Sequence, residues 1–184
     1  DTIIIGGGMA FTFIEAQNGQ IGDSLCEIDK LDLASDILKK AVEKEVKFLL
    51  PVDAKITQGF KNDGLFITKP IDEIPEGWMG LDIGEASISL FEQEILESKT
   101  ILWNGPMGVF EFSNFAQGTF EVANALSKAT LRGAYTLVGG GDSVSAISQA
   151  GLESSVSFVS TGGGAMLEMI EGKELPGIAA IKHS

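Results

Sequence analysis

The chain has 184 residues, a mass of 19.4 kDa and a formal net charge of −13, which is room for one domain of ordinary size. Hydrophobic residues make up 44% and charged residues 21%, and this balance excludes a chain that is disordered throughout. Because 26 acidic residues stand against 13 basic ones, we expect neither a nucleic-acid-binding stripe nor a polybasic membrane anchor.

Three further features bear on compartment and completeness. The single cysteine, Cys26, cannot form an internal disulfide, which favours a reducing compartment such as the cytoplasm. No apolar run approaches the roughly 18 residues of a membrane-spanning helix, so we expect no membrane contact. The chain opens with Asp1, Thr2 and Ile3, inside an apolar run and without an initiator methionine or a leader. We therefore expect a fragment of a longer protein.

Strand and helix patterns alternate along the chain. A β-branched run predicts the first strand, and apolar residues at helical spacing predict an amphipathic helix later on. In chain order we expect a strand at 2–5, helices at 9–17 and 33–46, a strand at 47–51, a surface excursion with a small strand or hairpin at 58–80, a strand at 80–83, a helix at 85–97, a strand at 100–103, a helix at 115–129, a strand at 134–138, a helix at 143–149, a strand at 155–159 and a helix at 165–171.

This alternation predicts the fold class. Strands that alternate with helices are typical of a mainly parallel sheet covered by helices on both faces. We therefore expect an α/β fold, a Rossmann-like three-layer α/β/α arrangement with a mainly parallel sheet. No linker or low-complexity tract divides the chain, so residues 1–184 are expected to form one domain.

Glycine is the compositional outlier, and it is clustered. Nine of the 23 glycines form three triplets, at 6–8, 139–141 and 162–164, each between an expected strand and an expected helix. Without a Cβ, such a turn lets a ligand approach the backbone, and the free N–H groups of the following helix are a seat for phosphate. The alternative is that each triplet only makes a tight turn. Three triplets at one edge of a sheet favour a binding site.

Known phosphate-binding fingerprints are absent. Neither the Gly-x-x-x-x-Gly-Lys-Ser/Thr pattern nor Gly-x-Gly-x-x-Gly occurs, which excludes a P-loop NTPase and argues against a dinucleotide dehydrogenase. Phosphoryl transfer needs cations to neutralise developing charge. No Lys or Arg lies within six residues of the first or third triplet. The chain can cradle phosphate, but it lacks the positive charge that a kinase needs.

Two segments add chemistry to the glycines. Asp142 and Ser143 follow the second triplet; the carboxylate either caps the helix or holds Mg²⁺ on a nucleotide phosphate, and the hydroxyl can donate to phosphate. Residues 103–111 combine polar Asn104 and Glu111 with apolar side chains, a mixture suited to gripping a base and a ribose.

The sequence excludes two kinds of site that depend on histidine. The only histidine, His183, is next to last in the chain, so neither a Ser-His-Asp triad nor a histidine-based metal site can be assembled. Cys26 has no basic neighbour in the sequence that would activate the thiol and is interpreted as structural.

The sequence resembles phosphoglycerate kinase in five segments that appear in the order of that family: residues 4–13, 77–84, 103–111, 138–143 and 160–165. The resemblance covers nearly the whole chain, but only the C-terminal, nucleotide-binding domain of that family. It implies reversible phosphoryl transfer between 1,3-bisphosphoglycerate and Mg-ADP, giving 3-phosphoglycerate and Mg-ATP in glycolysis, by a monomer of two lobes that close about a hinge.

The resemblance also implies roles for single residues. At the base, Gly7 and Gly8 would lie under the adenine with Phe60 at its edge, Pro106 and Val109 would pack against it, and Glu111 would hold the ribose hydroxyls. At the phosphates, Asn104 would reach the phosphate groups, Asp142 would hold Mg²⁺, and Gly140, Gly141 and Ser143 would contact the terminal phosphates. The third triplet, Gly162, Gly163 and Gly164, would help to stabilise the transferring group. Ser143 stands where many members have threonine, which keeps the hydroxyl.

The departures from the family point to truncation. The N-terminal lobe with its basic substrate site is missing, as is the lysine-bearing Gly-Gly-Ala-Lys segment that normally precedes the strand at 2–5. The first hypothesis is therefore a nucleotide-binding fragment that is inactive alone and that needs the missing lobe as partner. The second is a non-catalytic α/β module that keeps the fold for protein interaction. The third is a different enzyme of phosphate ligands that a partner chain completes.

Overall fold

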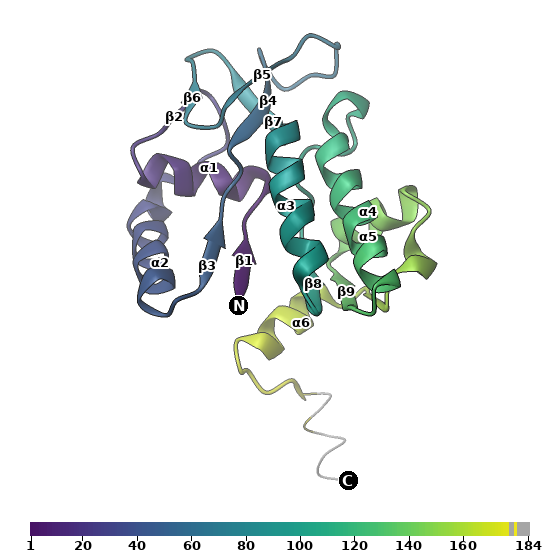
Figure 1. The fold of residues 1–184 in the computed structure, drawn as a ribbon. Coiled ribbons are helices and arrows are strands. Elements are labelled where there is room, and N and C mark those ends of the chain that lie inside the picture. The colour runs from purple at the N-terminus through teal and green to yellow at the C-terminus, as the bar shows by residue number, and fades with distance from the viewer. Residues whose placement is uncertain (177–178, 180–184) are drawn as a thin grey trace.

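A computed structural model describes residues 1–176 and 179 of the chain. Its helices and strands alternate as the sequence predicts (Figure 1). The helices are α1 (Gly7–Ala16), α2 (Leu31–Glu43), α3 (Glu85–Glu97), α4 (Gln117–Leu131), α5 (Gly141–Gln149) and α6 (Gly163–Ile170), and the strands are β1 (Thr2–Ile4), β2 (Gln20–Ile21), β3 (Lys47–Leu49), β4 (Asp53–Thr57), β5 (Ile67–Pro70), β6 (Glu73–Ile74), β7 (Met79–Ile83), β8 (Thr100–Trp103), β9 (Tyr135–Gly139) and β10 (Phe158–Ser160). Every expected helix is present, with ends that differ by a few residues.

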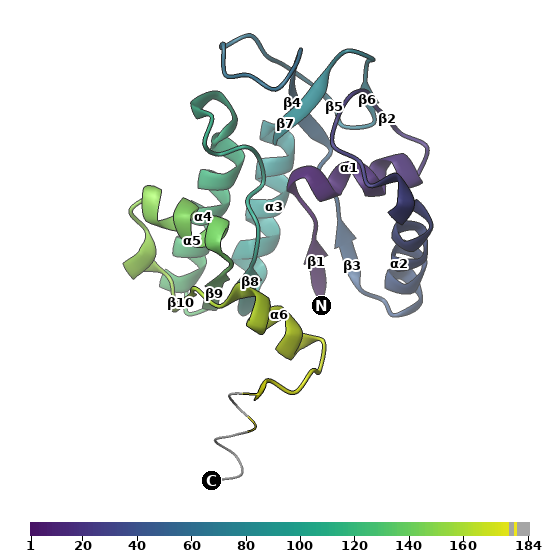
Figure 2. The same cartoon turned by 180° about the vertical axis from the view of Figure 1, so that it is seen from behind.

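The strands pair mostly in parallel, which confirms the predicted fold class. β8, β9 and β10 form one parallel sheet, β1 pairs with β3, and β2 pairs with β6. Figure 1 shows α3 and α4 in front of β8 and β9, and the reverse view in Figure 2 shows α1 and α6 on the other side. The expected three layers are therefore present.

An antiparallel sheet was not expected. β4 pairs with β5 on one side and with β7 on the other, both antiparallel. β5 and β6 confirm the small strands predicted within 58–80, whereas β4 has no counterpart among the expected elements. Its sequence, Asp-Ala-Lys-Ile-Thr, carries two charges, and Lys55 is buried all the same. A buried charge conceals the apolar pattern by which strands are recognised.

Two strands of the parallel sheets face each other across a gap. In β1 the carbonyl of Asp1 accepts a hydrogen bond from Lys47 N–H, so Asp1 and Ile3 direct their backbone groups at β3. Because a parallel ladder alternates, the backbone groups of Thr2 and Ile4 point the other way. Among the described residues, no strand pairs with β1 on that second side.

The edge of β8 is unpaired in the same way. Tyr135 N–H donates to the Lys99 carbonyl, so the backbone groups of Thr100 and Leu102 face away from β9. No strand in the described part of the chain pairs with them. The mainly parallel sheet is thus divided, with β3 and β1 on one side of the gap and β8, β9 and β10 on the other.

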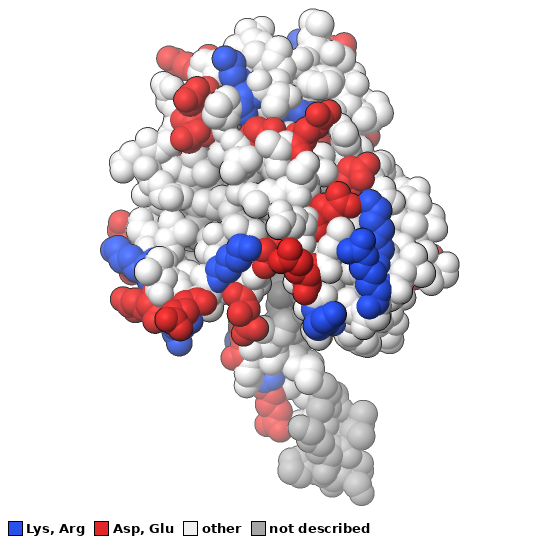
Figure 3. Space-filling model, viewed as in Figure 1, with Lys and Arg blue, Asp and Glu red and all other residues white. Residues whose placement is uncertain are grey.

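The apolar core is divided in two as well. The larger cluster lies among α3, α4 and the β8–β10 sheet and includes Phe91, Leu126 and Val138; the smaller lies between α1 and β4 and includes Phe11 and Ile56. Figure 3 shows acidic and basic side chains scattered over one face of the molecule, with no continuous basic patch. No helix among residues 1–176 is long and apolar enough to cross a membrane.

Candidate functional site at the carboxyl ends of the strands

The three glycine triplets meet at one loop, residues 104–111, which we call the hub loop. The first triplet contacts it closely: a Cβ on Gly7 would lie 2.8 Å from the Pro106 carbonyl oxygen, and a Cβ on Gly6 would overlap the side chain of Met107. Gly7 also has a φ of +61°, which residues with a side chain rarely adopt. Glycine is therefore required here by both space and conformation.

The second and third triplets converge on Asn104. Gly140 has a φ of +88°, and a Cβ at this position would overlap the Asn104 amide oxygen; a Cβ on Gly163 would overlap the backbone of Gly140. Gly105 N–H donates to Ser143 Oγ over 2.6 Å. The second and third triplets thus lie in contact with each other, and all three adjoin the hub loop, with the helix N-termini of α5 and α6 beside it.

Hydrogen bonds from α4 and β7 hold the middle of the hub loop. The N–H groups of Met107 and Gly108 both donate to Thr119 Oγ1, at 3.1 and 3.2 Å, and Val109 N–H donates to the Leu81 carbonyl at 2.8 Å. Thr119 lies in the first turn of α4 and is fully buried. Three consecutive backbone donors of the loop are therefore satisfied by α4 and β7.

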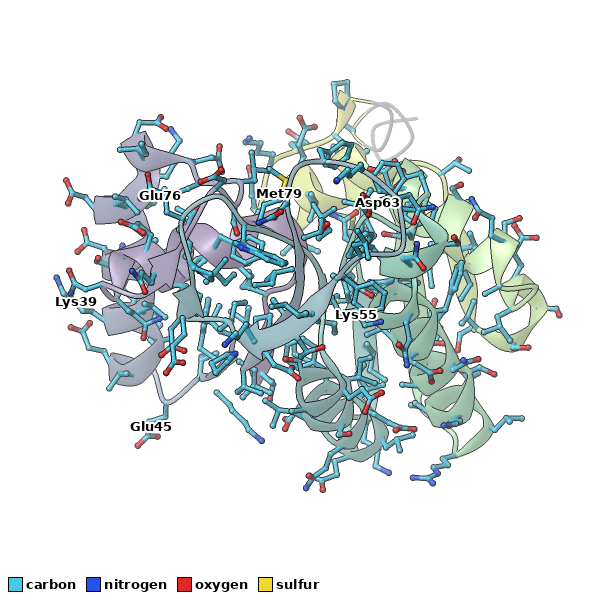
Figure 4. The ribbon with its side chains drawn as sticks, turned by 90° about the horizontal axis from the view of Figure 1, so that it is seen from above. Lys39, Glu45, Lys55, Asp63, Glu76 and Met79 are labelled. Carbon is cyan, nitrogen blue, oxygen red and sulfur yellow. The ribbon has the colours of Figure 1, made fainter. Side chains whose placement is uncertain are left out.

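A buried carboxylate joins these two elements. Asp82 of β7 accepts hydrogen bonds from Gly118 N–H and from Ile83 N–H, both at 2.9 Å. Burial outweighs these hydrogen bonds and the nearby Lys55 ammonium, at 3.9 Å, and raises the pKa of Asp82 to about 7. Lys55 itself donates to Gln117 Oε1 over 2.6 Å. Lys55 is buried, and Figure 4 shows it near the middle of the molecule, whereas Lys39 and Glu45 lie at the edge.

The hub loop borders a cavity of about 1040 Å³ that continues into the gap between β1 and β8. Of the predicted site residues, those that line it are Gly7, Gly8, Phe60, Asn104, Pro106 and Val109. Its charged lining residues are acidic, namely Asp23, Asp82 and Glu94, and neither Lys nor Arg is among the described residues that line it. The shortage of cations noted in the sequence therefore holds in three dimensions.

The remaining predicted residues do not line the cavity. Gly140, Ser143 and Gly163 adjoin Asn104, while Glu111, Asp142, Gly141, Gly162 and Gly164 are exposed. Phe60 packs against Phe112 with ring centroids 4.9 Å apart, so the 58–74 excursion does reach the end of the hub loop. Gly141 and Gly164 have open space where a Cβ would stand.

The structure decides against one role of Asp142. It lies in the first turn of α5, but the N-cap is Gly140 and no side chain caps this helix. The capping alternative was wrong because the helix begins inside the glycine triplet. The exposed carboxylate is left at a helix N-terminus with no side-chain partner among the described residues. No group of three or more metal-ligating side chains occurs within residues 1–176.

Three contributors to the site were missed by reading the sequence: Asp82, Thr119 and Lys55. One signal pointed to the first, because an aspartate between Leu81 and Ile83 interrupts an apolar strand, which a buried and bonded carboxylate explains. Cys26 is partly buried against the smaller core cluster, as its structural interpretation expects. His183 lies outside the described residues.

Parallel strands with glycine turns, helix N-termini and a cavity at their carboxyl ends define a Rossmann-like α/β protein. Comparison with known proteins gives the family. A family model for phosphoglycerate kinase matches residues 1–173, and the chain belongs to the phosphoglycerate kinase family.

Relatives and solved structures agree on this family. Curated proteins named phosphoglycerate kinase are 55% identical over 184 residues in Chloroherpeton thalassium and 57% identical over 182 residues in Porphyromonas gingivalis. The solved phosphoglycerate kinase of Coxiella burnetii matches 97% of this chain with a TM-score of 0.92 at 42% identity, and that of Pyrococcus horikoshii matches 99% with a TM-score of 0.80 at 28% identity.

The same comparisons measure what the chain covers. The matched segments are 46% and 44% of the two curated relatives, and 46% and 45% of the two solved chains. The chain therefore spans about half the length of the curated relatives that it matches.

Proposed function

We propose that this chain is the C-terminal, nucleotide-binding half of a phosphoglycerate kinase. The complete enzyme would move a phosphoryl group reversibly from the acyl phosphate of 1,3-bisphosphoglycerate to Mg-ADP, releasing the carboxylate of 3-phosphoglycerate and forming Mg-ATP. By itself, the half described here binds the adenine nucleotide and does not catalyse the transfer.

The observation that carries this proposal is the convergence of three glycine triplets on the hub loop. Asn104 touches Gly140 and Gly163, and Pro106 touches Gly7, so backbone N–H groups and two helix N-termini surround one loop. That arrangement favours an extended phosphate ligand with an apolar base at one end.

The proposed roles follow the order of these contacts along a nucleotide. The adenine is bound by Gly7 and Gly8 below it, Phe60 at its edge, and Pro106 and Val109 against its face, and Glu111 binds the ribose. Asn104 contacts the phosphates, and Gly140, Gly141 and Ser143 contact the terminal phosphates. Gly162, Gly163 and Gly164 lie at the transferring group. The lining of the cavity supports the adenine end of this assignment.

Asp142 is the residue that fits Mg²⁺. Mg²⁺ keeps several waters and needs only one or two protein carboxylates when substrate phosphates supply the other oxygens. An exposed carboxylate without a side-chain partner among the described residues, two residues after the N-cap glycine, matches that requirement. The ion would neutralise phosphate charge, while Asp142 would orient the phosphates relative to α5.

The chain is inactive alone in this proposal because no Lys or Arg of the described residues lines the cavity, and phosphoryl transfer needs positive charge around the transferring oxygens. The other half of the polypeptide is the partner that supplies it. The complete enzyme would be a cytoplasmic monomer of two lobes.

The gap between β1 and β8 is where we expect part of that partner to attach. Core residues Phe91 and Leu126 line it from the side of α3 and α4, and Leu167 and Ile170 of α6 also line it. A strand with apolar faces on both sides is typical of the interior of a parallel sheet. One such strand, preceding β1 in the full polypeptide, would join both open edges.

Calorimetry on the folded chain tests the nucleotide proposal. We expect weak binding of Mg-ADP that Glu111→Ala and Asp142→Ala each reduce by about tenfold, which corresponds to the loss of roughly one charge-assisted hydrogen bond or ligand. Glu153→Ala removes the same charge from an exposed position in another turn and should leave the affinity unchanged.

A coupled assay tests the proposed inactivity. The isolated chain should give no turnover above the background of the assay, and robust turnover would show that its own cations suffice. A folded chain that binds no Mg-nucleotide would contradict the proposal and favour a nucleotide-independent interaction module.

A further inference from the structure

Asp82 occupies a position that its burial alone does not explain. Its carboxylate is wedged between two glycines, because a Cβ on Gly108 of the hub loop or on Gly118 of α4 would overlap its Oδ1 atom. Neither glycine has a positive φ, so space around the carboxylate, and not backbone conformation, requires glycine at both. The carboxylate is thus the packing surface for the hub loop as well as an acceptor of hydrogen bonds.

The hydrogen bonds that hold residues 107–109 of the hub loop all end at residues next to Asp82 or next to its partner Gly118. Val109 is bonded to Leu81, the residue before Asp82. Met107 and Gly108 are bonded to Thr119, the residue after Gly118, and Gly118 is bonded to Asp82 itself. Asp82 therefore joins β7 to α4, the two elements that are hydrogen-bonded to the loop.

We propose that Asp82 is a positioning residue whose protonation state sets the order of the hub loop. As a neutral carboxyl, it fills the space between Gly108 and Gly118 without the cost of burying a charge, and the start of α4 stays against β7. Once ionised, the carboxylate favours contact with water, because burial outweighs its hydrogen bonds, so the loop that covers it is held less firmly. Binding of a base and ribose by the loop, which rests on the function proposed above, then weakens.

Few charges act on the carboxylate. Lys55 of β4 is the one charged side chain that perturbs it among the described residues; from α4 the neighbours are the Gly118 amide and the neutral Gln117, which binds Lys55. Within β7 the contact is with the Ile83 amide. The transition is therefore governed by burial, opposed by one cation, and falls near neutral pH, since the pKa of Asp82 is about 7.

Amide NMR between pH 5 and pH 9 tests the proposal without any nucleotide. We expect the N–H signals of Gly108, Val109 and Gly118 to titrate together with a midpoint near pH 7. Asp82→Asn should abolish this titration. Lys55→Met should move the midpoint upward, because loss of the cation disfavours the carboxylate further.

A matched control is available in Asp53, a second carboxylate that accepts from backbone N–H groups at a helix start, those of Ala86 and Ser87 in α3. Asp53→Asn should leave the titration of Gly108 and Val109 unchanged. Loop amides that do not move over this range in the unmodified chain would overturn the proposal, even if Asp82→Asn fails to fold.

Adenosine gives a second readout, because it carries no phosphate that titrates over this range. Its affinity should fall by about threefold to tenfold from pH 6 to pH 8, equivalent to about 0.7–1.4 kcal/mol, and Asp82→Asn should make the affinity independent of pH. Adenosine affinity that is equal at both pH values would count against the positioning role. Absence of adenosine binding at any pH would instead contradict the proposed function, and the amide titration would then decide the role of Asp82.

Discussion

At the scale of the residue, a carboxylate in the core gives the molecule an unusual dependence on pH. The pKa of Asp82 is about 7 in the folded chain, against about 3.9 when unfolded. Between these values the folded state binds more protons than the unfolded state, so the contribution to stability is full below about pH 4 and is lost as the pH rises to 7. An acid whose pKa is lowered by an ion pair in the folded state behaves in the opposite way, because its contribution to stability is lost as the pH falls.

Urea unfolding at pH 5 and pH 8 measures this contribution. We expect the unmodified chain to lose roughly 2 kcal/mol more than Asp82→Asn between the two pH values, since each pKa unit corresponds to about 1.4 kcal/mol. Comparing the difference between pH values cancels the cost of substituting the side chain itself. Equal losses in the two proteins would show that Asp82 is ionised throughout.

At the scale of the element, the start of α4 is the support of the hub loop. The Thr119 hydroxyl accepts from two consecutive loop amides, Met107 and Gly108, in a fully buried position. Valine has nearly the same shape as threonine but offers no acceptor, so Thr119→Val leaves two N–H groups unsatisfied.

Thr119→Val should therefore destabilise the chain by about 2–4 kcal/mol, at about 1–3 kcal/mol for each buried unsatisfied group with some relaxation. Thr119→Ser keeps the hydroxyl and loses only a methyl group, so its cost should be about 1 kcal/mol. Thermal unfolding of both variants is the measurement. Equal destabilisation by the two substitutions would mean that the methyl group, and not the hydroxyl, carries the interaction.

At the scale of the whole molecule, the divided sheet is the main feature. The backbone groups of Thr2 and Ile4 face those of Thr100 and Leu102 across an apolar cavity. Glu94 of α3 joins the outer end of this gap to β1 through Thr2 Oγ1, at 2.6 Å, and to β3 through Lys47. An open edge on each side is a template for an added strand.

Overlapping synthetic peptides from the unmatched part of the 55% identical relative test whether a strand is added. At about 12 residues each, they exceed an ordinary strand, and we expect one group of neighbouring peptides to slow hydrogen exchange at Thr2, Ile4, Thr100 and Leu102. N-methylation of alternate amides in that peptide should abolish the protection, because it removes the donors that would pair with the edges.

Two substitutions on α6 locate the binding. Leu167 lines the cavity, whereas Met169, on the same helix, does not, and both are partly exposed, at 40% and 61%. Leu167→Lys should weaken the peptide by about tenfold, while Met169→Lys should have no effect. Protection confined to other strands, or equal effects of the two substitutions, would contradict attachment in the gap.

Much of the fold is predictable because it depends on local patterns. The spacing of apolar residues locates α3 at residues 85–97 and β8 at residues 100–103 without error. The glycine triplets mark the turns between strands and helices, and Asn18, whose φ is +64°, follows the end of α1 in the left-handed conformation that terminates many helices. The position of the site at the strand ends follows from the same alternation.

What local pattern cannot give is which groups meet once the chain is folded. Asp142 could be a cap or a free ligand by its sequence, and only the start of α5 at the glycine triplet excludes the cap. The sequence gives no sign that Lys55 is buried, but pairing of β4 with β7 and packing of α4 bury it beside Asp82. Composition and periodicity therefore predict the elements, the glycine-rich edge and the lack of cations. The hub loop, the carboxylate beneath it and the open gap in the sheet depend on contacts between residues that are distant in the chain, and these exist only in the folded molecule.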